Sequence, residues 1–328
     1  MPDTVLVTGG SGFIASHTIR ALLDRGYAVR ATVRSRDKGA ALKDQFPEIE
    51  TAQADLGADA GWRDAAAGAA FVLHMASPFP MNVPDDRDTL IRPAVEGTKR
   101  VLRAAAEAGA RRAVVTSSVA AIAYGQPGRD AAFTEDDWTD PENPKVEAYP
   151  ASKTLAERAA WATASEAQLP LAVINPVLVT GPLLSGTYGA SVGLIKRMLS
   201  GGFPALPRTG FGVVDVRDVA SAHVEAMERD EAAGERFILS ERWMWLTEVA
   251  EVLKERFPDR RVSTRQAPDF MVKLAALFDK SARQVSGDLG TRRAADGSKA
   301  ARMLGIDYLP APRSIAATGE SLIDQGLV

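Results

Sequence analysis

The stretch TVLVTGGSGFIA, residues 4–15, decides the fold. It begins as a β-branched apolar run, passes through Gly9, Gly10 and Gly12, and continues into a helical pattern. Glycine permits a tight turn and a close approach of the main chain to a ligand, and the helix N-terminus directs free amide groups at it. A lone glycine pattern is as often a plain turn. Strand, turn and helix together predict a binding site for a nucleotide diphosphate.

Outward from this turn, short β-branched runs alternate with helical patterns. Strands are predicted near residues 4–8, 28–34, 49–53, 70–75, 112–117 and 171–175. The helix that starts near Phe13 stops at Gly26, and a long helix near 87–108 stops at Gly109. This alternation predicts an α/β fold of the Rossmann type, in which helices cover both faces of a doubly wound parallel sheet.

After Pro176 the alternation weakens, because glycine and proline interrupt the helical pieces. We therefore predict a dinucleotide-binding domain at 1–176 and a smaller C-terminal α+β unit, for the substrate, at 177–209 and 231–328. Residues 210–230, a valine-rich run followed by a helix, are expected to return to the first domain. Further helices are predicted near 246–256, 268–278 and 312–325.

Composition narrows the function classes. The 328 residues carry 39 Lys and Arg against 42 Asp and Glu, so the net charge of −3 offers no strong field for nucleic acid or an anionic membrane. Neither a signal-peptide pattern nor a membrane-spanning run is present, and we expect a cytoplasmic protein. The absence of cysteine and three scattered histidines predict no metal site, so redox chemistry requires an organic cofactor.

A tyrosine and a lysine form the candidate catalytic pair. Tyr149 and Lys153, in YPASK at 149–153, share one face of a predicted helix. A nearby ammonium is expected to lower the tyrosine pKa from about 10, which makes the phenol a usable general acid. The pair alone is common in exposed helices. Its position after the strand that ends in TSS, residues 116–118, favours catalysis.

The segment ATVRSRDK, residues 31–38, predicts the cofactor type. An acidic residue at the end of the second strand suits NAD, whereas an arginine there suits the 2′-phosphate of NADP. Arg34 holds that position, and Arg36 and Lys38 follow it. We therefore expect NADPH in preference to NADH, with Arg34 in a charge-assisted phosphate contact. The alternative is a solvated basic loop.

These motifs together resemble the extended short-chain dehydrogenases/reductases. The spacing of Gly9, Gly12 and Ala15 differs from GxGxxG and is similar to the glycine motif of that family. Other matching segments are Asp55-Leu56, HMASP (74–78), TSS (116–118), YPASK (149–153), INPVLVTGP (174–182) and SKAARMLG (298–305). Tyr149 to Trp161 fits YxxSKTLAExAAW, which resembles the dihydroflavonol 4-reductases and cinnamoyl-CoA reductases.

The resemblance implies roles for individual residues. Tyr149 protonates a carbonyl oxygen, Ser118 hydrogen-bonds the same oxygen, and Lys153 also holds the nicotinamide ribose. Ser117 competes for the role of Ser118 and is placed on the cofactor side. The predicted cofactor-binding residues are Gly9, Gly12, Phe13, Ile14, Arg34, Lys38, Asp55, Leu56, Ala76, Ser77, Ser117, Pro176 and Val179. Relatives of this kind occur as monomers and as homodimers paired through helices near 88–108 and 147–167.

The function predicted is NADPH-dependent reduction of hydrophobic aldehydes or ketones to alcohols. One alternative is a nucleotide-sugar epimerase or dehydratase that retains NAD, and another is a non-catalytic NADP sensor. The basic residues after the second strand favour a reductase, which releases its cofactor in each turnover, over an epimerase that retains it. A non-catalytic sensor has no need of Ser118, Tyr149 and Lys153 together.

The substrate class rests on Ala123. Dihydroflavonol reductases carry a polar residue five positions beyond the catalytic serine, where this chain has Ala123. Residues 119–123 either line an apolar pocket or pack beneath it, and Tyr124 is the first polar side chain after them.

Overall fold

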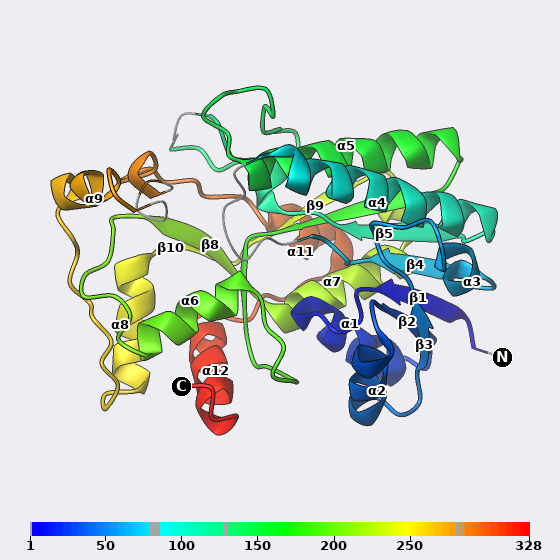
Figure 1. Ribbon diagram of the computed structural model, residues 1–328, viewed down its shortest axis with the longest axis horizontal. Helices are drawn as coiled ribbons and strands as arrows, with labels where there is room; N and C mark the ends of the chain where they lie inside the picture. Colours follow the sequence, from blue (N-terminus) through cyan, green and yellow to red (C-terminus); the bar gives the residue numbers. More distant parts are fainter. Residues whose placement is uncertain (1, 79–85, 127–129, 280–282, 284) are drawn as a thin grey trace.

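The computed structural model describes residues 2–78, 86–126, 130–279, 283 and 285–328 (Figure 1). Its main sheet has seven parallel strands in the order β3-β2-β1-β4-β5-β6-β9. The strands are β1 (Thr4–Thr8), β2 (Ala28–Val33), β3 (Glu50–Gln53), β4 (Phe71–His74), β5 (Arg112–Thr116), β6 (Leu171–Pro176) and β9 (Arg236–Leu239). The predicted doubly wound parallel α/β fold is confirmed.

Helices cover both faces of this sheet (Figure 1). On one face, α1 (Phe13–Asp24) packs against α7 (Val216–Glu228), and α2 (Arg36–Gln45) follows β2. On the other face, α4 (Asp88–Glu107) packs against α3 (Trp62–Ala66) and α5 (Ala148–Glu166). Strand β1 contributes side chains to the hydrophobic cores on both faces of the sheet, because successive side chains of a strand point to opposite faces. Val5 and Val7 lie in the core with α1, and Leu6 lies in the core with α4.

The strand order reverses between β1 and β4. On one side of this point the chain adds β2 and β3, and on the other side it adds β5, β6 and β9. Connections that leave in opposite directions open a crevice at the carboxyl ends of the two strands, where ligands of such sheets bind. Gly9 follows β1 and Met75 follows β4, so both lie at this crevice.

A second unit lies beside the main sheet and has a sheet of its own, in the order β10-β8-β7 (Figure 1). Its strands are β7 (Leu178–Thr180), β8 (Gly210–Asp215) and β10 (Arg242–Trp245). Its helices are α6 (Ala190–Leu199), α8 (Leu246–Arg256), α9 (Asp269–Ala275) and α12 (Ala311–Asp324), whereas α11 (Ser298–Leu304) packs against β9 and α7 of the main sheet. Helix α12 packs against α6 and α8 and covers the small sheet.

The expected return of residues 210–230 to the main sheet is wrong for the strand. Strand β8 pairs with β7 and β10 in the small sheet, and only α7, which follows it, packs against the main sheet. The strand that rejoins the main sheet is β9, which pairs with β6 and falls within the 231–328 range expected for the second unit. All four β9 residues are buried, and four residues are too few to show a periodicity.

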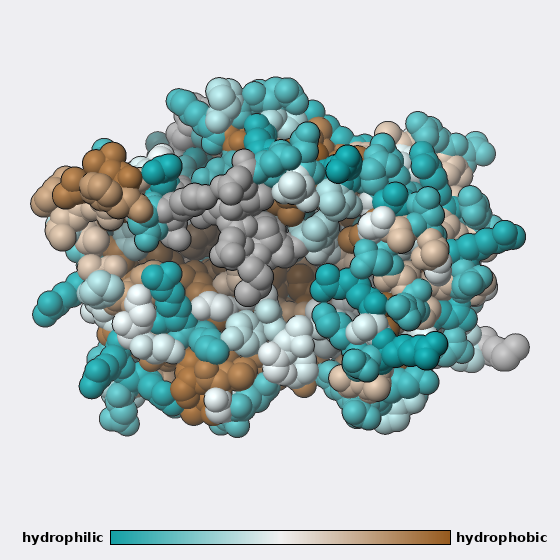
Figure 2. Space-filling model, in the orientation of Figure 1, coloured by the Kyte–Doolittle hydropathy of each residue, from teal (hydrophilic) through white to brown (hydrophobic). Residues whose placement is uncertain are grey.

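Helix α9 exposes several large apolar side chains on the surface. None of its residues is buried, and Phe270, Met271 and Leu274 are 70%, 54% and 59% exposed. They contribute to the brown patch at the upper left of Figure 2. Within the described ranges, no helix combines the length and the apolar character that crossing a membrane requires.

Candidate active site

The turn after β1 has no room for a side chain at Gly9. The φ angle of Gly9 is +68°, and a Cβ there would lie 2.9 Å from the Cα of Ala76. The Gly9 amide donates to Thr32 Oγ1 (3.1 Å), and the Gly10 amide donates to Thr32 O (3.0 Å). These contacts hold the turn against the end of β2 and the segment after β4.

Helix α1 begins directly after this turn, with Gly12 as its N-cap. Glycine supplies no capping side chain, so the first-turn amides of Phe13 and Ile14 have no acceptor within the helix. The positive end of the helix dipole lies at the same point, and such a terminus binds phosphate groups. The Phe13 and Ile14 side chains pack in or against the core. The turn and the helix N-terminus therefore fit a dinucleotide pyrophosphate through main-chain groups.

Basic side chains follow the end of β2. Arg34 and Lys38 are exposed at the start of α2, where the N-cap Ser35 accepts a hydrogen bond from the Lys38 amide. Neither side chain has an ion-pair partner among the residues that the structure describes. Asp55, exposed, and Leu56, partly buried, lie beyond the neighbouring β3. The structure thus gathers these four predicted cofactor residues around the carboxyl ends of β2 and β3.

His74 braces the strands on either side of the crevice. Thr98 Oγ1 donates to a carbonyl of its own helix and so accepts from His74 Nε2 (3.3 Å), which leaves Nδ1 to accept from Thr8 Oγ1 (2.8 Å). Thr8 Oγ1 accepts in turn from the amides of the two residues after β4. Burial, helped by the Lys153 charge, lowers the pKa of His74 to about 3. A neutral, fully hydrogen-bonded imidazole of this kind is structural.

Ser118 and Tyr149 meet at the end of β5. Their side chains are hydrogen-bonded, and Ser118 Oγ also accepts from the Ala120 amide (3.1 Å) as the N-cap of the short helix η1 (Val119–Ala121). Tyr149 lies in the first turn of α5, four residues before Lys153. The structure therefore brings the three predicted catalytic residues to one place, and of the two serines it is Ser118 that contacts the tyrosine.

The expected lowering of the Tyr149 pKa is wrong for this structure. Burial of the phenol raises its pKa, and the hydrogen bond with Ser118 opposes this only in part. Lys153 is not among the groups that shift it. The physical reason is desolvation, because a buried phenolate loses its hydration. Tyr149 is consequently protonated at neutral pH, which is the state that a proton donor needs.

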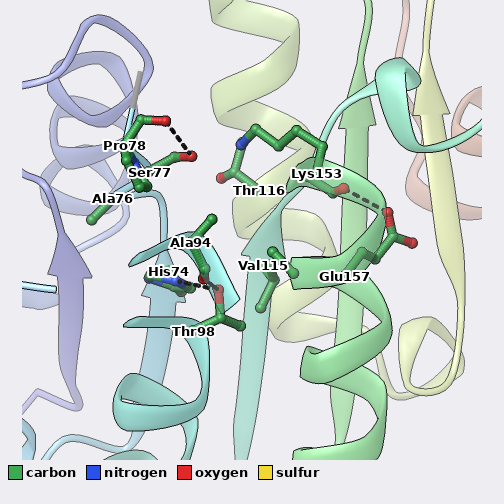
Figure 3. A pocket seen from close by; sticks show the side chains of 12 residues that line it. His74, Ala76, Ser77, Pro78, Ala94, Thr98, Val115, Thr116, Lys153 and Glu157 are labelled. Atoms are coloured by element: carbon green, nitrogen blue, oxygen red, sulfur yellow. Dashed lines mark hydrogen bonds between the residues drawn. The ribbon is translucent and has the colours of Figure 1, made fainter. Parts of the chain in front are cut away.

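The Lys153 side chain extends into a cavity between β4, β5 and α5 (Figure 3). Ala76 and Ser77, after β4, and Ser117, after β5, also line this cavity. Lys153 is only 8% exposed, and this burial lowers its pKa to about 8, although Glu157 raises it. Lysine and cofactor-side residues that are far apart in the sequence therefore share one cavity.

Two residues that the sequence predicted as cofactor-binding, Pro176 and Val179, do not line this cavity. Pro176 is buried at the end of β6, where it pairs with Leu239 of β9. Val179, in β7, is 7% exposed and belongs to the hydrophobic core. The structure does not bring the Val179 side chain together with the catalytic residues, and its cofactor contact stays a prediction.

Most of the segment after Ser118 packs beneath the site. Ile122 and Ala123 are 0% and 1% exposed and belong to a small core with Phe133. Val119 and Tyr124 remain partly exposed. Of the two readings left open for residues 119–123, packing holds for residues 120–123, and Val119 and Tyr124 are the side chains left to border a substrate.

Sequence reasoning assigned no role to three buried residues below the catalytic set, Glu157, Asn175 and Arg236. The Glu157 carboxylate is 0% exposed and accepts hydrogen bonds from both of the others. Glu157 stands one helical turn after Lys153 within the YxxSKTLAExAAW pattern, and Asn175 lies within INPVLVTGP, so both had a sequence signal that was given no role. Arg236 had no such signal, because its strand pairs with a distant segment.

Comparison with known proteins agrees with this geometry. The model of the NAD dependent epimerase/dehydratase family matches residues 5–239, which include the glycine turn, Ser118, Tyr149 and Lys153. The chain belongs to this family. Its members are the extended short-chain dehydrogenases/reductases, so the predicted resemblance is confirmed.

Individual relatives in this family are reductases. Cinnamoyl-CoA reductase 1 from Petunia hybrida is 41% identical over 272 residues, which are 80% of each chain. Cinnamoyl-CoA reductase CAD2 from Medicago truncatula is 35% identical over 98% of this chain and 95% of its own. Among solved structures, yeast methylglyoxal/isovaleraldehyde reductase Gre2 complexed with NADPH has a TM-score of 0.83 at 28% identity, over 99% of this chain and all of its own.

Proposed function

We propose that this protein is an NADPH-dependent reductase of hydrophobic aldehydes and ketones. The observation that carries the proposal is the hydrogen-bonded Ser118–Tyr149 pair with Lys153 beside it, at the crevice where a phosphate-binding turn begins. Reductases among its relatives, one of them solved with NADPH, support the same assignment.

The cofactor site is assigned to main-chain and basic groups. The turn at Gly9 and the amides at the start of α1 would hold the pyrophosphate, and Arg34 with Lys38 would hold a 2′-phosphate. Lys153 would hold the nicotinamide ribose. NADPH supplies a hydride for the carbonyl carbon when it is bound.

The chain's own residues then supply the proton. Tyr149 donates its phenolic proton to the carbonyl oxygen, so a hydride and a proton together convert the carbonyl into an alcohol. Ser118 donates a hydrogen bond to the same oxygen as negative charge develops on it. The phenolate that remains on Tyr149 regains its proton from solvent. Burial keeps the phenol protonated beforehand.

Arg34, exposed and without an ion-pair partner among the described residues, favours this reductase over an epimerase that retains NAD. A 2′-phosphate needs a cationic partner, and a reductase must release and rebind its cofactor in each turnover. The assay that separates the two candidates is NADPH oxidation with a carbonyl panel, beside conversion of a nucleotide sugar without added cofactor. Carbonyl-dependent NADPH oxidation supports the reductase, and sugar conversion alone contradicts it.

Replacing Gly9 with alanine is expected to weaken NADPH binding and to destabilise the fold. A left-handed conformation costs a residue with a Cβ about 1–2 kcal/mol, and this Cβ also meets the Ala76 main chain. Gly26→Ala is the matched control, since Gly26 has φ +80° and nothing within 4 Å of the added Cβ. Urea unfolding and NADPH titration measure both effects. An unchanged NADPH Kd in Gly9→Ala would contradict the assigned turn.

The substrate panel tests the hydrophobic class. Ala123 offers no hydrogen bond and lies beneath the site, so nothing at that position recognises a ring hydroxyl. An aryl aldehyde and its ring-hydroxylated analogue are therefore expected to have kcat/KM values within about tenfold of each other, which is less than the effect of a pocket that requires the hydroxyl. A dihydroflavonol and a hydroxycinnamoyl thioester complete the panel. If either far exceeds the simple aldehydes and ketones, the proposed substrate class is wrong.

A further inference from the structure

The buried carboxylate of Glu157 lies at the centre of a polar network below the catalytic residues. Ser117 Oγ and Asn175 Nδ2 donate to Glu157 Oε2, at 2.5 and 2.8 Å. Arg236 Nε donates to Oε1 at 2.6 Å. These donors come from the end of β5, from β6 and from β9, so one side chain of α5 joins three neighbouring strands. Figure 3 shows Glu157 one turn along α5 from Lys153, with the hydrogen bond to Ser117 drawn.

Asn175 extends this network to the catalytic serine. Its Nδ2 also donates to the main-chain oxygen of Ser118 (3.2 Å). Glu157 therefore fixes the side chain of Ser117 directly and the main chain of Ser118 through Asn175. Because the Ser118 hydroxyl is hydrogen-bonded to Tyr149, two residues, Asn175 and Ser118, link the carboxylate to the proton donor.

Arg236 anchors Glu157 from the other side. One of its nitrogens donates to the carbonyls of Glu135 (2.6 Å) and Asp137 (3.0 Å), and the guanidinium lies 3.7 Å from the centre of the Trp138 ring. A buried ion pair gains little stability over apolar residues of similar size. Its position under the catalytic set is thus better explained by what it holds than by stability alone.

We propose that Glu157 is a positioning residue for the reductase reaction, which orders Ser117, Asn175 and Ser118 and supplies the negative charge that keeps the buried Lys153 in its cationic form. This inference rests on the proposed function. Because its side chain is 0% exposed, Glu157 acts through the residues it contacts.

The negative charge of Glu157 changes the pKa of Lys153 in a definite direction. Burial lowers the pKa of Lys153 to about 8, and Glu157 opposes that shift. The other groups around them are His74 on β4, which is neutral, Tyr149 on the same helix, which is protonated, and Arg236 on β9. Removal of the carboxylate charge leaves Arg236 uncompensated and lowers the Lys153 pKa further. The lysine ammonium is then lost at a lower pH than in the wild type.

The test compares Glu157→Gln with Glu135→Gln. Glu135 is a partly buried carboxylate whose side chain accepts from the Ile238 amide on β9; it meets the network only through its main-chain carbonyl, which contacts Arg236 and is kept in the glutamine variant. Wild type and both variants are measured at about pH 6.5 and about pH 8, by NADPH titration and by kcat/KM. In Glu157→Gln the loss in both quantities is expected to be at least about threefold greater at the higher pH, because the lysine pKa has fallen. The Glu135→Gln profile should follow the wild type.

A second variant separates ordering from charge. Asn175→Ala cuts the link to Ser118 and keeps the carboxylate, so it should lower kcat by a similar factor at both pH values with little change in NADPH Kd. Equal losses at both pH values in Glu157→Gln, or an Asn175→Ala enzyme with wild-type kcat, would overturn the inference. If Glu157→Gln does not fold, Asn175→Ala still decides the ordering role. If the wild type reduces no carbonyl, the proposed function fails, and the pH dependence of NADPH binding still tests the charge role.

Discussion

Tyr149→Phe is expected to lower the kcat of carbonyl reduction by about 10²- to 10⁴-fold, the usual contribution of a general acid, while the NADPH Kd stays within about twofold of wild type. The substitution removes the phenolic oxygen and keeps the ring that packs at the start of α5. Because burial already holds this phenol in its protonated form, the loss should persist across the neutral pH range. The measurements are steady-state kinetics with a good aldehyde substrate and NADPH fluorescence titration.

Lys153→Met is the comparison variant, which separates loss of the proton donor from loss of cofactor binding. Lys153 is assigned to the nicotinamide ribose, so this change should raise the NADPH Kd and, because the nicotinamide is no longer held in place, lower kcat as well. A Tyr149→Phe enzyme with wild-type turnover would remove Tyr149 from the proton-donor role. If Tyr149→Phe instead lost NADPH binding as strongly as Lys153→Met, the tyrosine would be a binding residue.

Arg34→Ala is expected to weaken NADPH binding by about 10- to 150-fold and to leave NADH binding nearly unchanged. A charge-assisted hydrogen bond contributes about 1.5–3 kcal/mol, and only NADPH carries the 2′-phosphate that would receive it. The guanidinium is exposed at the end of β2 without an ion-pair partner in the described part of the chain, so it is available for this contact.

Arg63→Ala is the matched control, because Arg63 is an exposed arginine on α3, on the opposite face of the main sheet. Its removal changes the net charge by the same amount and should leave both affinities unchanged. Titration of each variant with NADPH and with NADH measures the preference. Equal weakening of both cofactors in Arg34→Ala would mean that Arg34 does not read the 2′-phosphate.

Much of the main fold followed from local patterns. The strands from β1 to β6 were predicted within one or two residues of their observed bounds, because all except the polar β3 are runs of mainly β-branched or apolar residues. The glycine turn was equally clear, since a strand, three glycines and a helix stand consecutively at residues 4–15. The Tyr149 and Lys153 pair could be recognised because its spacing lies within a single helix.

Strand pairing in the second half was decided by tertiary packing. Residues 210–215 form a strand as expected, yet β8 pairs with β7 and β10, and the four-residue β9 takes the place beside β6. A period-two pattern shows that a segment is extended and which face is buried, but it carries no information about which strand becomes the neighbour. The partners follow from how the two units pack.

The sequence by itself predicted the parallel sheet, the glycine turn and the Tyr149–Lys153 pair, because each depends on residues that are adjacent or one helical turn apart. Only the tertiary structure decided the burial of Tyr149 and Lys153, which shifts their pKa values, and which of Ser117 and Ser118 contacts the tyrosine. It also revealed the Glu157–Arg236 pair, whose members are 79 residues apart. The physical reason is that desolvation and long-range hydrogen bonds depend on what surrounds a side chain after folding. Residues adjacent in the sequence do not specify that environment.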